Sequence, residues 1–124
     1  MTKKLEIYKC EICGNIVEVL EEAGGTLVCC GKPMVLQEEN SVDASKEKHV
    51  PILIKNEQGV EVNVGSIVHP MTEEHYIQWI EIQTEKGCSR KELLPGQEPK
   101  AFFPVKSEVV KVRIFCNLHG LWKN

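Results

Sequence analysis

Two groups of residues in this 124-residue chain could bind metal ions. The first group lies in the N-terminal segments KCEICGN and LVCCGKPM, which supply Cys10, Cys13, Cys29 and Cys30. Four thiolates suit tetrahedral zinc or a single iron ion. A zinc ribbon normally has two C-x-x-C pairs, whereas the second pair here is contiguous. We therefore expect a metal with distorted coordination, and the choice between zinc and iron stays open.

The second group combines histidines with one cysteine. The segment IFCNLHGLW places Cys116 and His119 at the end of an apolar run, and the chain has three further histidines, His49, His69 and His75. Five such donors overfill the closed tetrahedron of structural zinc. They leave one position of an octahedron open, which suits a redox-active iron that binds a small ligand. The thiolate would raise the electron density on that metal, as an axial cysteine does in haem oxygen chemistry.

Other kinds of metal protein remain as alternatives. A cupredoxin-like copper site also combines Cys and His at the end of a β-sandwich, but it has two histidines and a weak axial Met. No Met follows His119 in the sequence, although Met71 is close to His69. A zinc-ribbon binding module would explain the early cysteines and leave the four histidines without a role. A pure electron carrier would have a saturated second metal.

Composition and charge narrow the class of protein. The formal net charge of −3 and the pI near 5.8 give no basic surface for a nucleic acid partner. No apolar stretch approaches the roughly 20 residues of a membrane helix, and MTKKLEIYKC lacks the continuous apolar core of a secretory signal. We therefore expect a cytoplasmic protein without membrane contact, whose six cysteines stay reduced and bind metal.

The pattern of apolar residues predicts two domains and an all-β fold. Residues 1–37 are too few to fold alone, since units below ~40 residues usually need a metal, a disulfide or a partner chain. Within them, NIVEVLEEAGGTLV predicts a hairpin that turns at Gly24-Gly25. In residues 38–124, short β-branched runs separated by Gly and Pro predict an antiparallel β-sandwich. Helical turns are plausible only at 42–46 and 107–110.

The order of the expected strands predicts where the second group of donors lies. If consecutive strands alternate in direction, His49, His69, His75, Cys116 and His119 all come to one end of the sandwich. The strands used in this argument are 50–55, 60–68, 76–84, 89–94, 101–105 and a last strand that ends at Cys116.

Several segments resemble a known family. CEIC and VCCGKPM resemble desulforedoxin, and three further segments resemble the catalytic domain of superoxide reductases: EKHVP (47–51), HPMTEEHYIQWI (69–80) and CNLHGLW (116–122). Together they resemble desulfoferrodoxin, the two-iron superoxide reductase, over essentially the whole chain.

The resemblance implies a fold and a role for individual residues. It implies a desulforedoxin-like domain that holds Fe(Cys)₄, followed by an immunoglobulin-like sandwich that holds Fe(His)₄Cys. The four histidines would be equatorial ligands, and Cys116 would be the axial thiolate opposite an open position. Glu47 resembles the carboxylate that takes that position in the oxidised state, and Lys48 resembles the cation beside it. Cys88 is the one cysteine outside the pattern, and we expect an ordinary thiol there.

The function that follows is the reduction of superoxide by one electron and two protons to hydrogen peroxide, with no oxygen evolved. Superoxide is a small anion that the net negative charge repels weakly, and Lys48 can focus a local positive field at the site. The resemblance also implies rubredoxin as the electron donor and a homodimer as the assembly.

Overall fold

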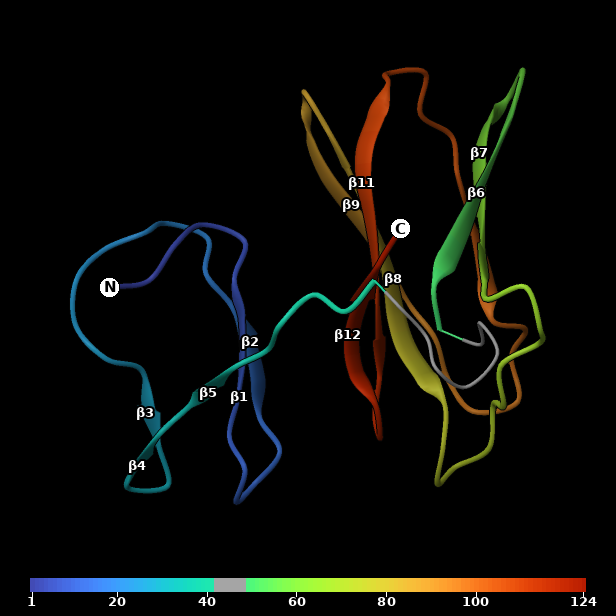
Figure 1. Ribbon diagram of the computed structural model, residues 1–124. Helices are drawn as coiled ribbons and strands as arrows, with labels where there is room; N and C mark the ends of the chain where they lie inside the picture. The colour runs from blue at the N-terminus through green and yellow to red at the C-terminus, as the bar shows by residue number, and fades with distance from the viewer. Residues whose placement is uncertain (42–48) are drawn as a thin grey trace. The chain divides into compact units, whose positions relative to one another are not determined.

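The computed structural model describes residues 1–41 and 49–124, and these form two compact units, residues 1–38 and 39–124 (Figure 1). Every regular element within the described residues is a β-strand, which confirms the predicted all-β class. Among these residues there is no helix that could cross a membrane. The helical turn predicted at 42–46 lies outside the described residues. The one predicted at 107–110 is wrong, because Ser107 lies in a bend and a strand begins at Val109.

The N-terminal unit consists of very short strands. β1 pairs antiparallel with both β2 and β5, and β3 pairs with β4. The hairpin predicted across Gly24-Gly25 is therefore wrong. β2 finds its partner in β1 because the cysteine-containing turn at 10–15 reverses the chain between them. The strands are β1 (Ile7–Lys9), β2 (Ile16–Glu18), β3 (Val28–Cys29), β4 (Lys32–Pro33) and β5 (Val35–Leu36).

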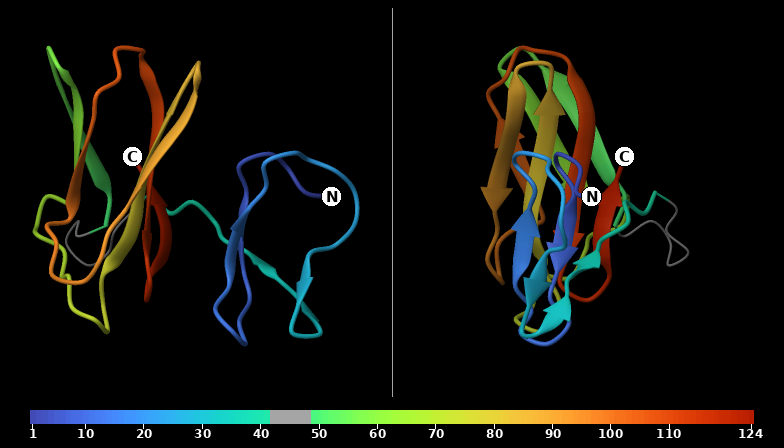
Figure 2. Two further views of the ribbon diagram at one scale, coloured as in Figure 1. Left: turned by 180° about the vertical axis from the view of Figure 1, so that it is seen from behind. Right: turned by 90° about the vertical axis from the view of Figure 1, so that its left-hand side faces the viewer.

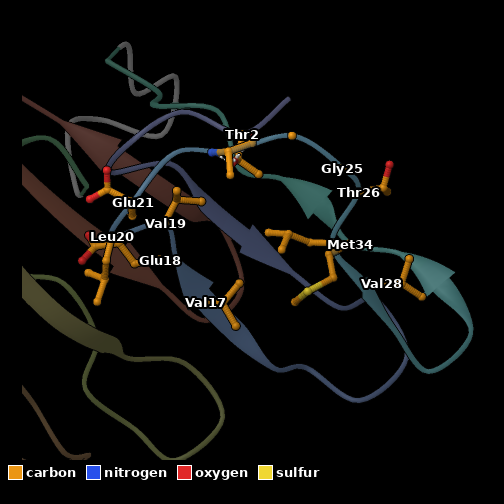
Figure 3. A pocket seen from close by; sticks show the side chains of 13 residues that line it. Thr2, Val17, Glu18, Val19, Leu20, Glu21, Gly25, Thr26, Val28 and Met34 are labelled. Carbon is orange, nitrogen blue, oxygen red and sulfur yellow. Dashed lines mark hydrogen bonds between the residues drawn. The ribbon is translucent and has the colours of Figure 1, made fainter.

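The apolar core of this unit is small. Its buried apolar side chains are those of Ile7, Cys10 and Val19. On its surface, a pocket of about 660 Å³ is lined in part by the apolar side chains of Val17 and Met34 (Figure 3). So few buried side chains cannot hold 38 residues in one conformation, and the unit needs a further source of stability, such as a bound metal or a partner chain.

The C-terminal unit is a sandwich of two antiparallel sheets, seen edge-on in Figure 1 and from two other sides in Figure 2. One sheet has the order β10-β7-β6 and the other has the order β12-β11-β8-β9. Seven strands divided three and four correspond to an immunoglobulin-like sandwich. The strands are β6 (Pro51–Asn56), β7 (Gly59–Val64), β8 (Ile77–Thr84), β9 (Gly87–Glu92), β10 (Lys100–Phe103), β11 (Val109–Cys116) and β12 (Gly120–Lys123).

A β-bulge interrupts the central pair of strands near one end of the sandwich. Phe115 of β11 lies opposite Trp79 of β8, but the next residue, Cys116, lies opposite Ile77, so Gln78 is the extra residue. Successive side chains of a strand point to opposite faces, and an inserted residue reverses that alternation beyond it. Ile77 consequently belongs to the core together with Ile80 and Ile82, although it lies an odd number of positions from each of them.

The outer face of the larger sheet contains a buried network of charges. Glu81 of β8 is fully buried, and it accepts hydrogen bonds from Arg113 of β11 at 2.7 Å and Arg90 of β9 at 2.6 Å. Arg113 also contacts Glu39 at 3.2 Å, and Lys111 binds the other oxygen of Glu39 at 2.7 Å. Burial alone would raise the pKa of Glu39, but these two cations outweigh it and lower that pKa. The network therefore fixes the start of the unit, at Glu39, to β11.

We predict that Glu81→Leu lowers the free energy of unfolding by about 3 kcal/mol, because it leaves the buried Arg113 without its main partner. The measurement is urea unfolding followed by tryptophan fluorescence, since Trp79 and Trp122 both lie in this unit. The control is Glu98→Gln, because Glu98 is 78% exposed in its pair with Lys100. It should change stability by less than about 0.5 kcal/mol. Equal losses in the two variants would contradict the prediction.

Candidate metal centres

The four N-terminal cysteines converge on one point, from two turns of the chain. All four Sγ atoms lie within 4.8 Å of one another. Cys10 and Cys13 flank the turn after β1, where Gly14 adopts a φ of +83° and its N–H donates to the Cys10 carbonyl at 3.0 Å. Cys29 ends β3, and Cys30 follows it with a φ of +54°. This left-handed backbone is rare for a residue other than Gly, and it turns two adjacent thiols toward the same point.

The distances between these sulfurs fit a tetrahedral metal. Cys13 Sγ lies 3.5 Å from Cys29 Sγ, and Cys29 Sγ lies 3.9 Å from Cys30 Sγ. A tetrahedron with metal–sulfur bonds of about 2.3 Å has sulfur–sulfur edges of about 3.8 Å. The site is therefore already near the dimensions that a bound metal requires.

Hydrogen bonds and neighbouring thiols push the pKa values of this cluster in opposite directions. Donation from the backbone N–H groups of Cys13 and Ile12 lowers the pKa of Cys10 to about 6. The contacts of Cys30 with the thiols of Cys13, Cys10 and Cys29 raise the pKa of Cys30 to about 12. Four adjacent thiolates repel one another, so a cation among them is needed to ionise the whole set.

The predicted convergence of the histidines and Cys116 is confirmed. Donor atoms of His49, His75, Cys116 and His119 lie within 4.8 Å of one another. The imidazole rings form a closed circuit with centroid distances of 4.7, 4.6, 5.0 and 4.7 Å, in the order His49, His69, His75, His119 and back to His49. The diagonal between His49 and His75 is 6.4 Å. These distances place the four rings near the corners of a square.

The surroundings of the His69 ring are those of a metal ligand. Its Nδ1 lies 2.7 Å from the Pro70 carbonyl, which can only accept, so Nδ1 carries the proton. Its Nε2 is buried and receives no hydrogen bond from the described residues. Burial, and then the neighbouring histidines, lower the pKa of His69 to about 4 despite that hydrogen bond. A neutral ring with one nitrogen fixed by a carbonyl and the other left with a lone pair is the usual arrangement of a metal-binding histidine.

Cys116 completes the donor set from the buried side. It ends β11, is fully buried, and its Sγ lies 3.8 Å from Nδ1 of His119. Burial raises the pKa of the Cys116 thiol, which favours the protonated form until a cation binds. His75 lies in the bend just before β8, whose first residue, Ile77, pairs with Cys116.

Asn117, which the sequence analysis did not single out, ties two ligand-bearing segments together. Its side-chain Oδ1 accepts from Tyr76 N–H at 2.9 Å and its Nδ2 donates to the Glu74 carbonyl at 3.0 Å. Its own backbone N–H donates to the Tyr76 carbonyl at 3.2 Å. These bonds hold the residues on both sides of His75 against the residue that follows Cys116. The only signal in the sequence is an Asn between two ligands just beyond a strand.

The described residues add no further predicted residue to this cluster. Glu47 and Lys48 lie outside the described residues. Cys88 is an exposed thiol in β9 and belongs to neither donor group. Met71, the axial ligand that a copper site would need, packs against the core, and its sulfur accepts from Ile77 N–H at 3.4 Å. Four convergent imidazoles also exceed the two of a cupredoxin site, so the copper alternative is not favoured.

Known proteins resemble both units. The family model described as Desulfoferrodoxin matches residues 41–124, and the model of the desulfoferrodoxin N-terminal domain matches residues 2–37. A desulfoferrodoxin of Syntrophotalea carbinolica is 57% identical over 124 residues, which is 100% of this chain and 98% of that protein. A desulforedoxin of Megalodesulfovibrio gigas is 62% identical over 37 residues, covering 30% of this chain and all of that protein.

A solved structure is similar over nearly the whole length. The crystal structure of the superoxide reductase from Treponema pallidum has a TM-score of 0.83 and 31% identity, and the match covers 99% of both chains. The similarity therefore extends across both units of this chain.

We predict that Asn117→Ala accelerates release of the C-terminal metal by about tenfold, because outer partners of metal ligands typically carry that much affinity. The measurement is the loss of the visible absorption of the iron-loaded protein in excess chelator.

The matched control for this variant is Asn56→Ala. The side chain of Asn56 accepts two backbone N–H groups, of Gln58 and Gly59, in the turn between β6 and β7. Iron release from this variant should equal that of the unaltered protein. Acceleration by both variants would mean that general loosening of the fold, rather than the bonds of Asn117, controls release.

Proposed function

The chain belongs to the desulfoferrodoxin family, and from that membership we propose that it is a superoxide reductase with two iron centres. The observation that carries this proposal is the square of four imidazoles beside the buried sulfur of Cys116. A module that only binds zinc, or a carrier with a saturated metal, has no use for five donors that leave a position open.

The two donor groups hold the two irons. Cys10, Cys13, Cys29 and Cys30 hold centre I, and His49, His69, His75, His119 and Cys116 hold centre II. Ferrous iron held by these five donors would supply the single electron that superoxide needs to become hydrogen peroxide when two protons are added. We retain 1–37 and 38–124 as the boundaries of the corresponding functional domains.

The residues around centre II control protons and charge. The Pro70 carbonyl keeps the proton of His69 on Nδ1, so that Nε2 stays available as a ligand. The complete burial of Cys116 excludes bulk water from its sulfur, and a bound cation would supply the positive charge that its thiolate needs there. We assign Lys48 the role of attracting the superoxide anion and of ordering the water that delivers protons. We assign Glu47 the role of occupying the open position in the oxidised state.

The electron donor and assembly are further parts of the proposal. We propose rubredoxin, or a similar small redox protein, as the donor that restores the ferrous state. We propose a homodimer, which is supported by the small core of the N-terminal unit and by its apolar pocket (Figure 3). We also propose a cytoplasmic location, because the cysteines of the two donor groups must stay reduced to bind metal.

The decisive experiment is the stoichiometry of the reaction under anaerobic conditions. We expect the reduced, iron-loaded protein to form one hydrogen peroxide for each superoxide consumed and to release no oxygen. Oxygen release at half that stoichiometry would identify a dismutase instead. A reduced protein that does not react would leave the electron-carrier alternative, and a colourless zinc protein would leave the binding module.

We predict that Lys48→Ala lowers the second-order rate with superoxide by about tenfold at low ionic strength and makes the rate less sensitive to salt. The measurement is pulse radiolysis of the reduced protein over a range of salt concentrations. Lys91→Ala, which removes an exposed lysine from β9, changes the net charge equally and serves as the control. An identical effect of both substitutions would assign the attraction to net charge rather than to Lys48.

A further inference from the structure

Trp122 of β12 stacks on one of the proposed iron ligands. Its indole lies parallel to the His49 imidazole, with a centroid distance of 4.7 Å and an angle of 14° between the planes. The rings of His69 and His119 meet His49 edge-on, at 67° and 76°. Trp122 therefore provides the parallel surface against which the His49 ring lies.

The same indole also holds a second ligand-bearing segment. Its Nε1–H donates to the backbone carbonyl of His119 at 3.0 Å. His49 and His119 are 70 positions apart in the sequence, and Nδ1 of His119 lies 3.0 Å from Nε2 of His49. One side chain thus contacts two neighbouring corners of the square, one through its face and the other through its N–H group.

The position of His49 in the chain explains why such a contact matters. The regular ladder of β6 begins only at Pro51, where it pairs with Val64. His49 therefore lies before the first ladder pair of its strand, and strand pairing does not fix the plane of its ring. Packing of side chains must do so. Trp122 itself is well fixed, since it pairs with Ile114 in the sheet, belongs to the core cluster and is 9% exposed.

We propose that Trp122 is a positioning residue of centre II, whose stacked indole sets the plane of the His49 imidazole and whose N–H group fixes the turn that carries His119. This inference rests on the proposed function only in assuming that iron binds at this site. The ring plane of an imidazole ligand decides how its π orbitals overlap those of the metal. Loss of the stack should therefore change the electronic structure of the iron.

The test compares Trp122→Leu and Trp122→Phe with Trp79→Leu. Trp79 is the matched control, because it is also 9% exposed and lies in the same sheet. It stacks on Phe115 at 5.8 Å rather than on a histidine. The readouts are the rhombicity of the ferric EPR signal, the visible charge-transfer band, the reduction potential, and iron release to a chelator.

We expect Trp122→Leu to shift the EPR signal and the visible band and to release iron about tenfold faster. Trp122→Phe retains a stacking ring and should restore most of the EPR signal. Trp79→Leu should leave both spectra unchanged at a similar loss of stability. If Trp122→Leu is destabilised like Trp79→Leu but keeps the original spectra and potential, Trp122 is only a core residue and the inference is wrong.

A second measurement covers the case in which Trp122→Leu fails to fold. In the unaltered protein loaded with diamagnetic zinc, the ring current of Trp122 should move the carbon-bound ring protons of His49 upfield, and Trp122→Phe should reduce that shift. The absence of any upfield shift would overturn the inference. None of these readouts uses superoxide, so a protein that passes them and does not reduce superoxide would refute the reductase proposal alone.

Discussion

The convergence of the donors depends on how the chain is held at the end of the central strand pair. Cys116 ends β11 opposite Ile77, and the bulge at Gln78 turns Ile77 into the core. The hydrogen bonds of Asn117 hold the residues on both sides of His75 against this end of the sheet. The position of His75 thus depends on contacts made just beyond the regular ladder.

The two centres prepare their donors by different physical means. In the N-terminal unit, backbone N–H groups point at sulfur and lower the pKa of Cys10, while hydrogen bonds with the neighbouring thiols raise that of Cys30. In the sandwich, burial removes water from the donors, which lowers the pKa of His69 and raises that of Cys116. Burial alone therefore favours the neutral imidazole of His69 and opposes the thiolate of Cys116. A bound cation would resolve this opposition by favouring the thiolate.

The sequence carried enough information for the fold class, for the two donor groups and for their convergence. The convergence follows from chain direction alone. In an antiparallel sheet, the last residue of one strand and the first residue of the next strand lie at the same end of the sandwich. The predictions that were wrong, and the features that were missed, concern local structure. The Gly24-Gly25 pair suggested a hairpin, but the cysteine turn supplied the closer partner strand. Alternation in YIQWIEIQT gave no sign of the bulge at Gln78 or of the complete burial of Glu81, since both depend on partners in β11.

The sequence separation of the ligands has a consequence for how the protein matures. Cys10 and Cys29 are 19 positions apart, whereas His49 and His119 are 70 apart and meet only when the sandwich has closed. The entropy cost of closing a loop rises with its length, and folds built on distant contacts form slowly. The donors of centre I can therefore come together once residues 1–38 have folded, whereas those of centre II come together only when the strands between His49 and His119 have assembled.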